Sequence, residues 1–250
     1  MIKKEKYSAA ILVIGDEILS GRTQDTNSNY ITKELEMMGI TTSEIRVIPD
    51  EKSIIINSVN ELRNRNNYLF TTGGIGPTHD DITADSIAEA FGVNLEVNSE
   101  AYDILKKYYK AIGSEFNEVR QRMARIPIGA TLIKNPISAA PGFKIDNVFV
   151  FAGIPKIMKS MLDNSLGFLN KGNLIHTITV KVDAVEGDIA TILKSLNDEN
   201  ESIKIGSYPF FNSDKDFGVN VVIRSLNKEF LTLTEEKFKN YLSKNSFNYN

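Results

Sequence analysis

The sequence contains no cysteine and only two histidines among its 250 residues. Without cysteine, the chain has no disulfide, no thiolate metal site and no cysteine nucleophile. The absence fits a reducing compartment, so we expect a cytoplasmic protein. No histidine and carboxylate stand at the helical spacing of a metal-ligand pair, which argues against the usual kind of zinc hydrolase.

Long apolar runs are also missing, so no segment is expected to span a membrane. The apolar stretch near the N-terminus is interrupted by Gly15, Asp16 and Glu17, and therefore predicts a buried strand instead of a signal peptide. A formal net charge of -3 gives no general attraction to nucleic acid or to an anionic membrane surface. We expect neither nucleic acid nor a membrane as a partner.

Apolar strand patterns alternate with amphipathic helical patterns in the first two thirds of the chain. Strands over residues 9–15, 40–48 and 68–72 enclose two helical patterns, which predicts a layered α/β/α fold with a mostly parallel sheet. Later patterns predict helices over 99–113, 115–127 and 155–168, and strands over 129–135 and 147–153.

A change of character near residues 170–173 predicts a domain boundary. We expect residues 1–170 to form the α/β domain. Residues 171–250 follow the order β-α-β-β-α and predict a small α+β domain with an antiparallel sheet.

The stretch TTGGIGPTHDDIT, residues 71–83, follows the third predicted strand and precedes a helix. In open α/β sheets, ligands bind beyond the carboxyl ends of the strands. Gly73, Gly74 and Gly76 let backbone N–H groups approach a phosphate. Asp80 and Asp81 would repel that anion unless a divalent cation bridged carboxylate and phosphate oxygens. The loop thus predicts a site for a phosphorylated ligand and a cation.

Other predicted strand ends carry similar chemistry. Asp16 and Glu17 follow the first strand, and Asp50 follows the second. The proline-containing loops SAAPGF and AGIPK follow later strands and suit backbone contact with a flat or phosphorylated ligand. These loops are expected to converge on one rim that binds a nucleotide or a nucleotide-like heterocycle. No Walker motif is present and no G-x-G-x-x-G follows the first strand, which excludes ordinary P-loop and dinucleotide sites.

Each feature also has a structural interpretation. The glycine loop fits a tight strand-to-helix connection. Asp50 fits a helix N-cap, and Asp80 with Asp81 fits the start of the next helix. His79 fits a solvated loop. A last group fits packing in the core or at an interface better than a stacking platform: Tyr102, Leu105, Tyr108 and Tyr109.

The glycine loop resembles the signature of the MoaB/Mog-type molybdopterin-binding domain family. The version in CinA-type N-terminal domains and in the molybdopterin-binding-like half of FAD synthase is closer still. IGDEILSGRTQDTNSNYITKEL, AAPGF and FAGIPK match other segments of the family, and IKIGSYPFF resembles the segment that follows this domain in FAD synthase. The loop GGIGPTHDD differs from the GGTG and single aspartate of the molybdopterin-pathway enzymes, which weakens an adenylyltransferase interpretation.

The resemblance implies a small-molecule nucleotide or pterin ligand and a homo-oligomer. CinA-type and FAD-synthase-type relatives imply a metal-dependent pyrophosphatase for FAD or ADP-ribose, with Mg²⁺, Mn²⁺ or Co²⁺ and possible use of K⁺. Molybdopterin binding or adenylylation, and a non-catalytic nucleotide-binding protein, are the alternatives. The sequence includes neither the deamidase domain of CinA proteins nor the adenylyltransferase domain of FAD synthase, so we expect neither of those activities.

The expected site residues are candidates for catalysis, for metal binding, for supporting roles and for substrate binding. Asp81, Asp50 and Asp16 are the catalytic candidates, and Asp81, Asp50 and Asp80 are the metal-ligand candidates. His79 is a candidate for orienting water, and Lys156 for offsetting phosphate charge. The substrate-binding candidates are Thr72, Gly73, Gly74, Gly76, Ser138, Pro141, Gly142, Gly153, Pro155 and Lys156.

Overall fold

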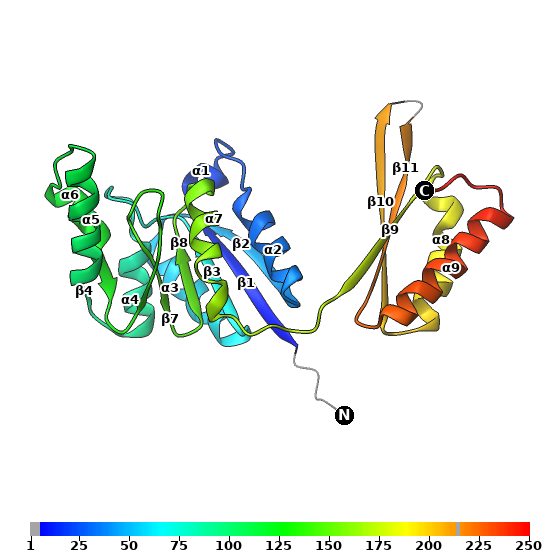
Figure 1. Ribbon diagram of the computed structural model, residues 1–250, viewed down its shortest axis with the longest axis horizontal. Helices are drawn as coiled ribbons and strands as arrows, with labels where there is room; N and C mark the ends of the chain where they lie inside the picture. The colour runs from blue at the N-terminus through cyan, green and yellow to red at the C-terminus, as the bar shows by residue number, and fades with distance from the viewer. Residues whose placement is uncertain (1–5, 214–215) are drawn as a thin grey trace. The chain divides into compact units, whose positions relative to one another are not determined.

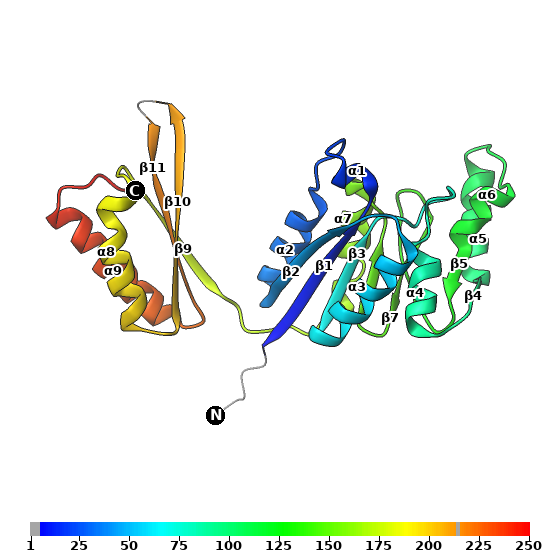
Figure 2. The ribbon, with the colours of Figure 1, turned by 180° about the vertical axis from the view of Figure 1, so that it is seen from behind.

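The computed structural model describes residues 6–213 and 216–250, and it divides the chain into two compact units, Met1–Gly172 and Asn173–Asn250. Figures 1 and 2 show the two units from opposite sides. The first is a layered α/β unit and the second is a small α+β unit, as the sequence predicts. No helix in the described ranges is long and apolar enough to cross a membrane.

The first unit is built on a mostly parallel sheet with the strand order β2-β1-β3-β8-β7-β6. The central pairings of β1 with β2 and β3, and of β3 with β8, are parallel, whereas β7 pairs antiparallel with β8 and with β6. The strands are β1 (Tyr7–Ile14), β2 (Ile40–Ile48), β3 (Tyr68–Thr72), β6 (Thr131–Ile133), β7 (Gly142–Ile145) and β8 (Val148–Phe151).

Helices cover both faces of this sheet, and β1 shows why its sequence is continuously apolar. Its alternate residues enter different cores: Leu12 packs with α3 (Lys52–Arg65) and α4 (Thr83–Phe91), whereas Ile11 packs with α2 (Asn27–Met37) and α7 (Pro155–Asp163). A strand buried on both faces needs apolar side chains at every position. The short turn η2 (Leu166–Phe168) follows α7.

The carboxyl ends of β1, β3 and β8 lie at the same edge, because these strands run parallel. In Figure 1 the chain enters β1 near the lower edge of the sheet, and the short helix α1 (Asp16–Leu19) lies at the upper edge. The glycine-rich loop after β3 and the loop after β8 therefore leave the sheet on the side that the sequence analysis assigned to ligands.

Between α4 and β6 the structure differs from the sequence prediction. The helix α5 (Ser99–Ala111) forms as expected, but the helix predicted over 115–127 is wrong in its second half. Only α6 (Glu118–Gln121) and the turn η1 (Arg122–Ala124) are helical. Residues Arg125–Pro127 form β5, which pairs antiparallel with β4 (Leu95–Val97). Pairing with a distant strand overrides the local helical pattern here.

The strand β7 is a second difference, because the sequence analysis assigned residues 138–143 to a loop. Its first residue, Gly142, lies against the backbone of β8: a Cβ there would stand 2.5 Å from the carbonyl oxygen of Val150. The glycine that suggested a loop is required by close approach of two strands.

The second unit has an antiparallel sheet of order β10-β11-β9, with α8 and α9 packed on one face (Figures 1 and 2). Its own core includes Val221, Ile189 and Phe238. The elements are β9 (His176–Val182), α8 (Glu186–Glu199), β10 (Ile203–Ser213), β11 (Asp216–Ser225) and α9 (Lys228–Lys244).

Candidate functional site

The glycine-rich loop is held tightly between the ends of neighbouring strands. Gly73 has φ 107°, and a Cβ at this position would lie 2.0 Å from the carbonyl oxygen of Ile14 at the end of β1. Its N–H donates to the carbonyl oxygen of Phe151 at the end of β8, at 3.1 Å. Only glycine fits both the positive φ and the close approach. The loop therefore has one fixed path across the edge of the sheet.

Asp81 closes the loop from the other side. Its Oδ1 accepts the N–H of Gly76 at 2.6 Å, and its Oδ2 accepts the N–H of Thr78 at 2.8 Å. A Cβ at Gly76 would lie 2.6 Å from Asp81 Oδ2. The Asp81 carboxylate thus fixes the conformation of the loop.

These contacts change the expected role of two glycines. The N–H groups of Gly73 and Gly76 already donate to protein oxygens, so they are not available to a phosphate. Within the described residues, the N–H groups of Gly74 and Ile75 have no acceptor. The backbone donors that remain for an anion are therefore those of Gly74 and Ile75.

Asp50 lies beside this loop and does not cap α3. The N-cap position of α3 is Glu51, whose side chain makes no capping hydrogen bond. Asp50 Oδ2 instead accepts the N–H of Asp16 at 3.0 Å, and a Cβ on Gly74 would lie 3.5 Å from Asp50 Oδ1. The N-cap interpretation of Asp50 is wrong, because the side chain turns away from the helix toward the first and third loops.

The electrostatic setting of Asp50 shows that acidic groups converge here. Burial raises the pKa of the Asp50 carboxyl, and the nearby charges of Glu17, Asp16 and Asp80 raise it further, against the lowering effect of the Asp16 N–H. Acids from the ends of β1, β2 and β3 therefore share one region.

A cavity of about 730 Å³ lies over this edge of the sheet. Several expected residues line it: Gly73, Gly74, Gly76, Asp81, Ser138, Gly153 and Pro155. The loop that brings Ser138 to the wall is organised by Asn135, whose Nδ2 donates to Ser138 Oγ at 2.7 Å and to the carbonyl oxygen of Ala140 at 2.8 Å. The sequence analysis did not select Asn135.

Other expected residues lie outside the lining of this cavity. Asp50 is partly buried and Asp16 and Asp80 are exposed, and none of the three lines it. Lys156 is exposed in the first turn of α7. His79 has a side chain that is 96% exposed, which matches a solvated loop residue. The remaining three contribute elsewhere: Thr72 and Pro141 line neighbouring hollows, and Gly142 begins β7.

Two tyrosines that were expected to serve in packing form a wall of the cavity. Leu105 is buried and Tyr102 packs edge-on against Phe116, as expected for packing residues. Tyr108 and Tyr109 line the cavity, and Tyr109 also packs against the core as expected. Tyr109 is held by stacking on Phe116, with ring centroids 5.6 Å apart. Helical spacing alone does not distinguish core packing from cavity lining, because the difference depends on which elements pack against α5.

The acidic groups do not form a complete metal site on their own. Among the residues that the structure describes, no three His, Asp or Glu side chains are arranged to hold a metal ion. Asp81, Asp50 and Asp80 are thus not a preassembled ligand set. Mg²⁺ is commonly held by one or two carboxylates together with substrate phosphates and water, so it does not require a complete set of protein ligands.

Together, the fold and the site define an α/β protein with a ligand cavity at the carboxyl edge of its sheet. Residues 10–171 match the profile of the family described as "Probable molybdopterin binding domain". The chain belongs to this family, in its CinA-like form. Residues 174–250 match the profile described as "FAD synthase, middle domain".

The chain is also similar to proteins of other organisms and to a solved structure. The chain is 35% identical over 199 residues to a protein of Archaeoglobus fulgidus, covering 80% of this chain and 84% of the relative. It is 32% identical to a protein of Pyrobaculum arsenaticum, covering 82% of this chain and 80% of that one. The crystal structure of the protein CinA, of unknown function, from Thermoplasma acidophilum matches with a TM-score of 0.60 and 28% identity, over 65% of this chain and 98% of that chain.

Proposed function

We propose that the cavity binds a dinucleotide-like diphosphate, FAD or ADP-ribose, and that the protein is a divalent-metal-dependent pyrophosphatase. The observation that carries this proposal is the meeting of carboxylates, free N–H groups and an aromatic wall at one cavity. Asp81 and Gly74 line the cavity together with Tyr108, and Asp50 lies beside Gly74. This combination suits a ligand with a heterocycle at one end and a diphosphate in the middle.

The backbone and aromatic groups have separate tasks in this proposal. The N–H groups of Gly74 and Ile75 donate to one phosphate, as loops at strand ends do in other phosphate sites. Tyr108 and Tyr109 offer an apolar surface to the heterocycle. Because Tyr109 is braced by Phe116, little side-chain freedom is lost on binding.

The acidic residues are proposed to bind a cation, Mg²⁺, Mn²⁺ or Co²⁺, with K⁺ as a possible second ion. Asp50 and Asp81 are the carboxylates that would hold it. Burial, and after it the charges of neighbouring acids, raise the pKa of Asp50, and a bound cation would favour its charged form. Such an ion neutralises phosphate charge and activates water.

The proposed reaction adds water across the diphosphate. FAD and water give AMP and FMN, whereas ADP-ribose and water give AMP and ribose 5-phosphate. Asp81 keeps the Gly74–Ile75 segment in place through its bonds to Gly76 and Thr78, so the phosphate meets a preformed donor pair.

The test is the release of AMP from FAD or ADP-ribose by the full chain, with each metal and with a chelator. We expect AMP only with metal, and a loss of about 100-fold or more in Asp50→Asn, because removal of one stabilising group commonly costs this much. Thermal unfolding of each variant checks that it is folded. A folded wild type that releases no AMP with any metal would contradict the proposal.

Molybdopterin binding or adenylylation is the second candidate, and the family description favours it. Transfer of AMP from ATP to the pterin phosphate, or tight pterin binding, would support it over pyrophosphate cleavage. A non-catalytic nucleotide-binding protein is the third candidate, because no complete protein ligand set for a metal exists among the described residues. Binding of ADP-ribose without turnover, unchanged in Asp81→Asn, would support it.

A further inference from the structure

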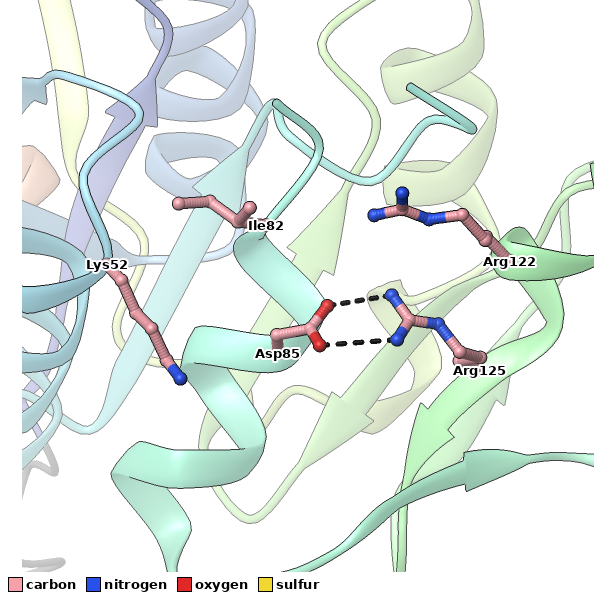
Figure 3. A pocket seen from close by; sticks show the side chains of 5 residues that line it. All are labelled: Lys52, Ile82, Asp85, Arg122 and Arg125. Carbon is pink, nitrogen blue, oxygen red and sulfur yellow. Dashed lines mark hydrogen bonds and ion pairs between the residues drawn. The ribbon is translucent and has the colours of Figure 1, made fainter. Parts of the chain in front are cut away.

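A second hollow, of about 490 Å³, lies on the outer side of the first turn of α4. Figure 3 shows the five side chains that line it: Lys52, Ile82, Asp85, Arg122 and Arg125. Three of the five carry positive charge, in a part of the molecule that adjoins the glycine loop.

Two of these cations already have anionic partners. Arg125 forms a two-pronged contact with Asp85, at 2.9 and 3.3 Å, drawn as dashed lines in Figure 3. Lys52 pairs with Glu89 at 2.6 Å. The Arg122 side chain has no hydrogen-bond or ion-pair partner within the described residues. Figure 3 shows its guanidinium beside that of Arg125.

Arg122 also lies next to the main cavity. It lines a narrow hollow together with Ile75, Gly76 and Asp81, and these three residues line the main cavity as well. Its neighbour Met123 lines both spaces. The unpaired guanidinium therefore stands at the border of the glycine loop.

The main cavity lacks the positive charge that a diphosphate needs. Among the described residues that line it, none is lysine or arginine, and its charged members are Glu17 and Asp81. Like charges about 4 Å apart repel by about 4 kcal/mol near a protein surface. With the N–H groups of Gly73 and Gly76 already used, the backbone offers little compensation. A guanidinium at the border meets this need.

We propose that Arg122 binds the diphosphate of the substrate and acts as a catalytic residue in its cleavage. The inference rests on the proposed function and names the group that neutralises its anionic ligand. The planar guanidinium donates two parallel hydrogen bonds to phosphate oxygens, which a lysine ammonium does not reproduce.

The proposed step is balanced without a further reactant. The water oxygen forms a bond to one phosphorus, the bond from that phosphorus to the bridging oxygen breaks, and the bridging oxygen leaves on the other phosphate. The water proton passes to solvent. Negative charge grows on the leaving phosphate, and Arg122 offsets it, as arginine does in other phosphoryl transfers.

The test compares Arg122→Gln and Arg122→Lys with Lys33→Gln, which removes one positive charge from an exposed position on α2. AMP release gives kcat and KM for ADP-ribose, and equilibrium binding with Ca²⁺ gives the affinities for ADP-ribose and for adenosine. We expect Arg122→Gln to lower kcat/KM by about 100-fold or more. Its affinity for ADP-ribose should fall, and its affinity for adenosine should stay unchanged.

The outcomes separate the inference from the proposed function. If the wild type neither binds nor cleaves ADP-ribose, both fall. If the wild type is active and Arg122→Gln matches Lys33→Gln in kcat/KM, only the inference is overturned. If Arg122→Gln does not fold, Arg122→Lys decides: a loss of kcat/KM with unchanged thermal stability supports the inference, and wild-type kinetics overturn it.

Discussion

Asp50 is the residue whose chemistry depends most on its neighbours. Its carboxylate is partly buried, accepts one backbone N–H from Asp16, and faces other acids across the ends of the strands. Burial and like charge both favour the neutral acid, so the pKa of Asp50 is raised. When no cation is bound, the charged Asp50 carboxylate therefore destabilises the folded protein.

The sign of this effect gives a prediction. Because the folded-state pKa lies above the ordinary value of 3.8, the native state binds more protons than the unfolded state between the two pKa values, so stability falls as pH rises through that window. We expect Asp50→Asn to unfold at higher urea concentration than wild type at pH 7, with a difference that disappears below about pH 3.8.

Urea unfolding between pH 3 and pH 7 in a chelator measures the effect. Asp103→Asn, at an exposed position on α5, controls for the change in net charge. Equal stability of the two variants at pH 7 would contradict the account of Asp50.

At the scale of elements, an ion pair connects β5, the strand that pairs with β4, to α4. Arg125 lies in β5 and Asp85 lies in the first turn of α4, and both side chains are about one third exposed, at 32% and 35%. The Nε atom of Arg125 is buried and has no hydrogen-bond partner among the described residues, which carries a desolvation cost. The contact positions η1, and with it Arg122.

A double-mutant cycle tests this connection. We expect Arg125→Gln and Asp85→Asn to couple by about 1 kcal/mol in the free energy of unfolding, since the pair is two-pronged and partly shielded. The more exposed pair Lys52–Glu89 serves as the control and should couple more weakly, because solvent screens it. Equal coupling energies in the two pairs would show that the two-pronged geometry of Arg125 adds no stability.

Elements differ in how far local sequence predicts them. β1 and β3 are predictable because their buried residues 9–14 and 68–70 form continuous apolar runs, as expected for strands covered on both faces. β5 is not, because its residues complete a helical pattern and become a strand only through pairing with β4. β7 is hidden by a glycine and a proline that local rules assign to a loop.

Within the candidate site, too, local sequence predicts some features and not others. The glycine loop and the acids that follow β1 and β2 are predictable, because strand ends of a parallel sheet meet at one edge. The use of the Gly73 and Gly76 N–H groups by other protein atoms is not, since it depends on β8 and on Asp81. Arg122 and Tyr108 are brought to the site by elements that no local motif marks.

At the scale of the whole molecule, the two units have separate cores and different architectures. The first carries the cavity, the acids and Arg122 within one compact body. The second packs its helices on one face of an antiparallel sheet. The residues to which the proposed chemistry is assigned all belong to the first unit.

The most direct measurement is a crystal structure of the full chain with ADP-ribose and Mn²⁺, in which anomalous scattering locates the ion. The account predicts a phosphate within hydrogen-bond distance of the Gly74 and Ile75 N–H groups, the other phosphate at Arg122, and the ion against Asp50 or Asp81. A diphosphate bound away from this loop, or an ion held elsewhere, would contradict it.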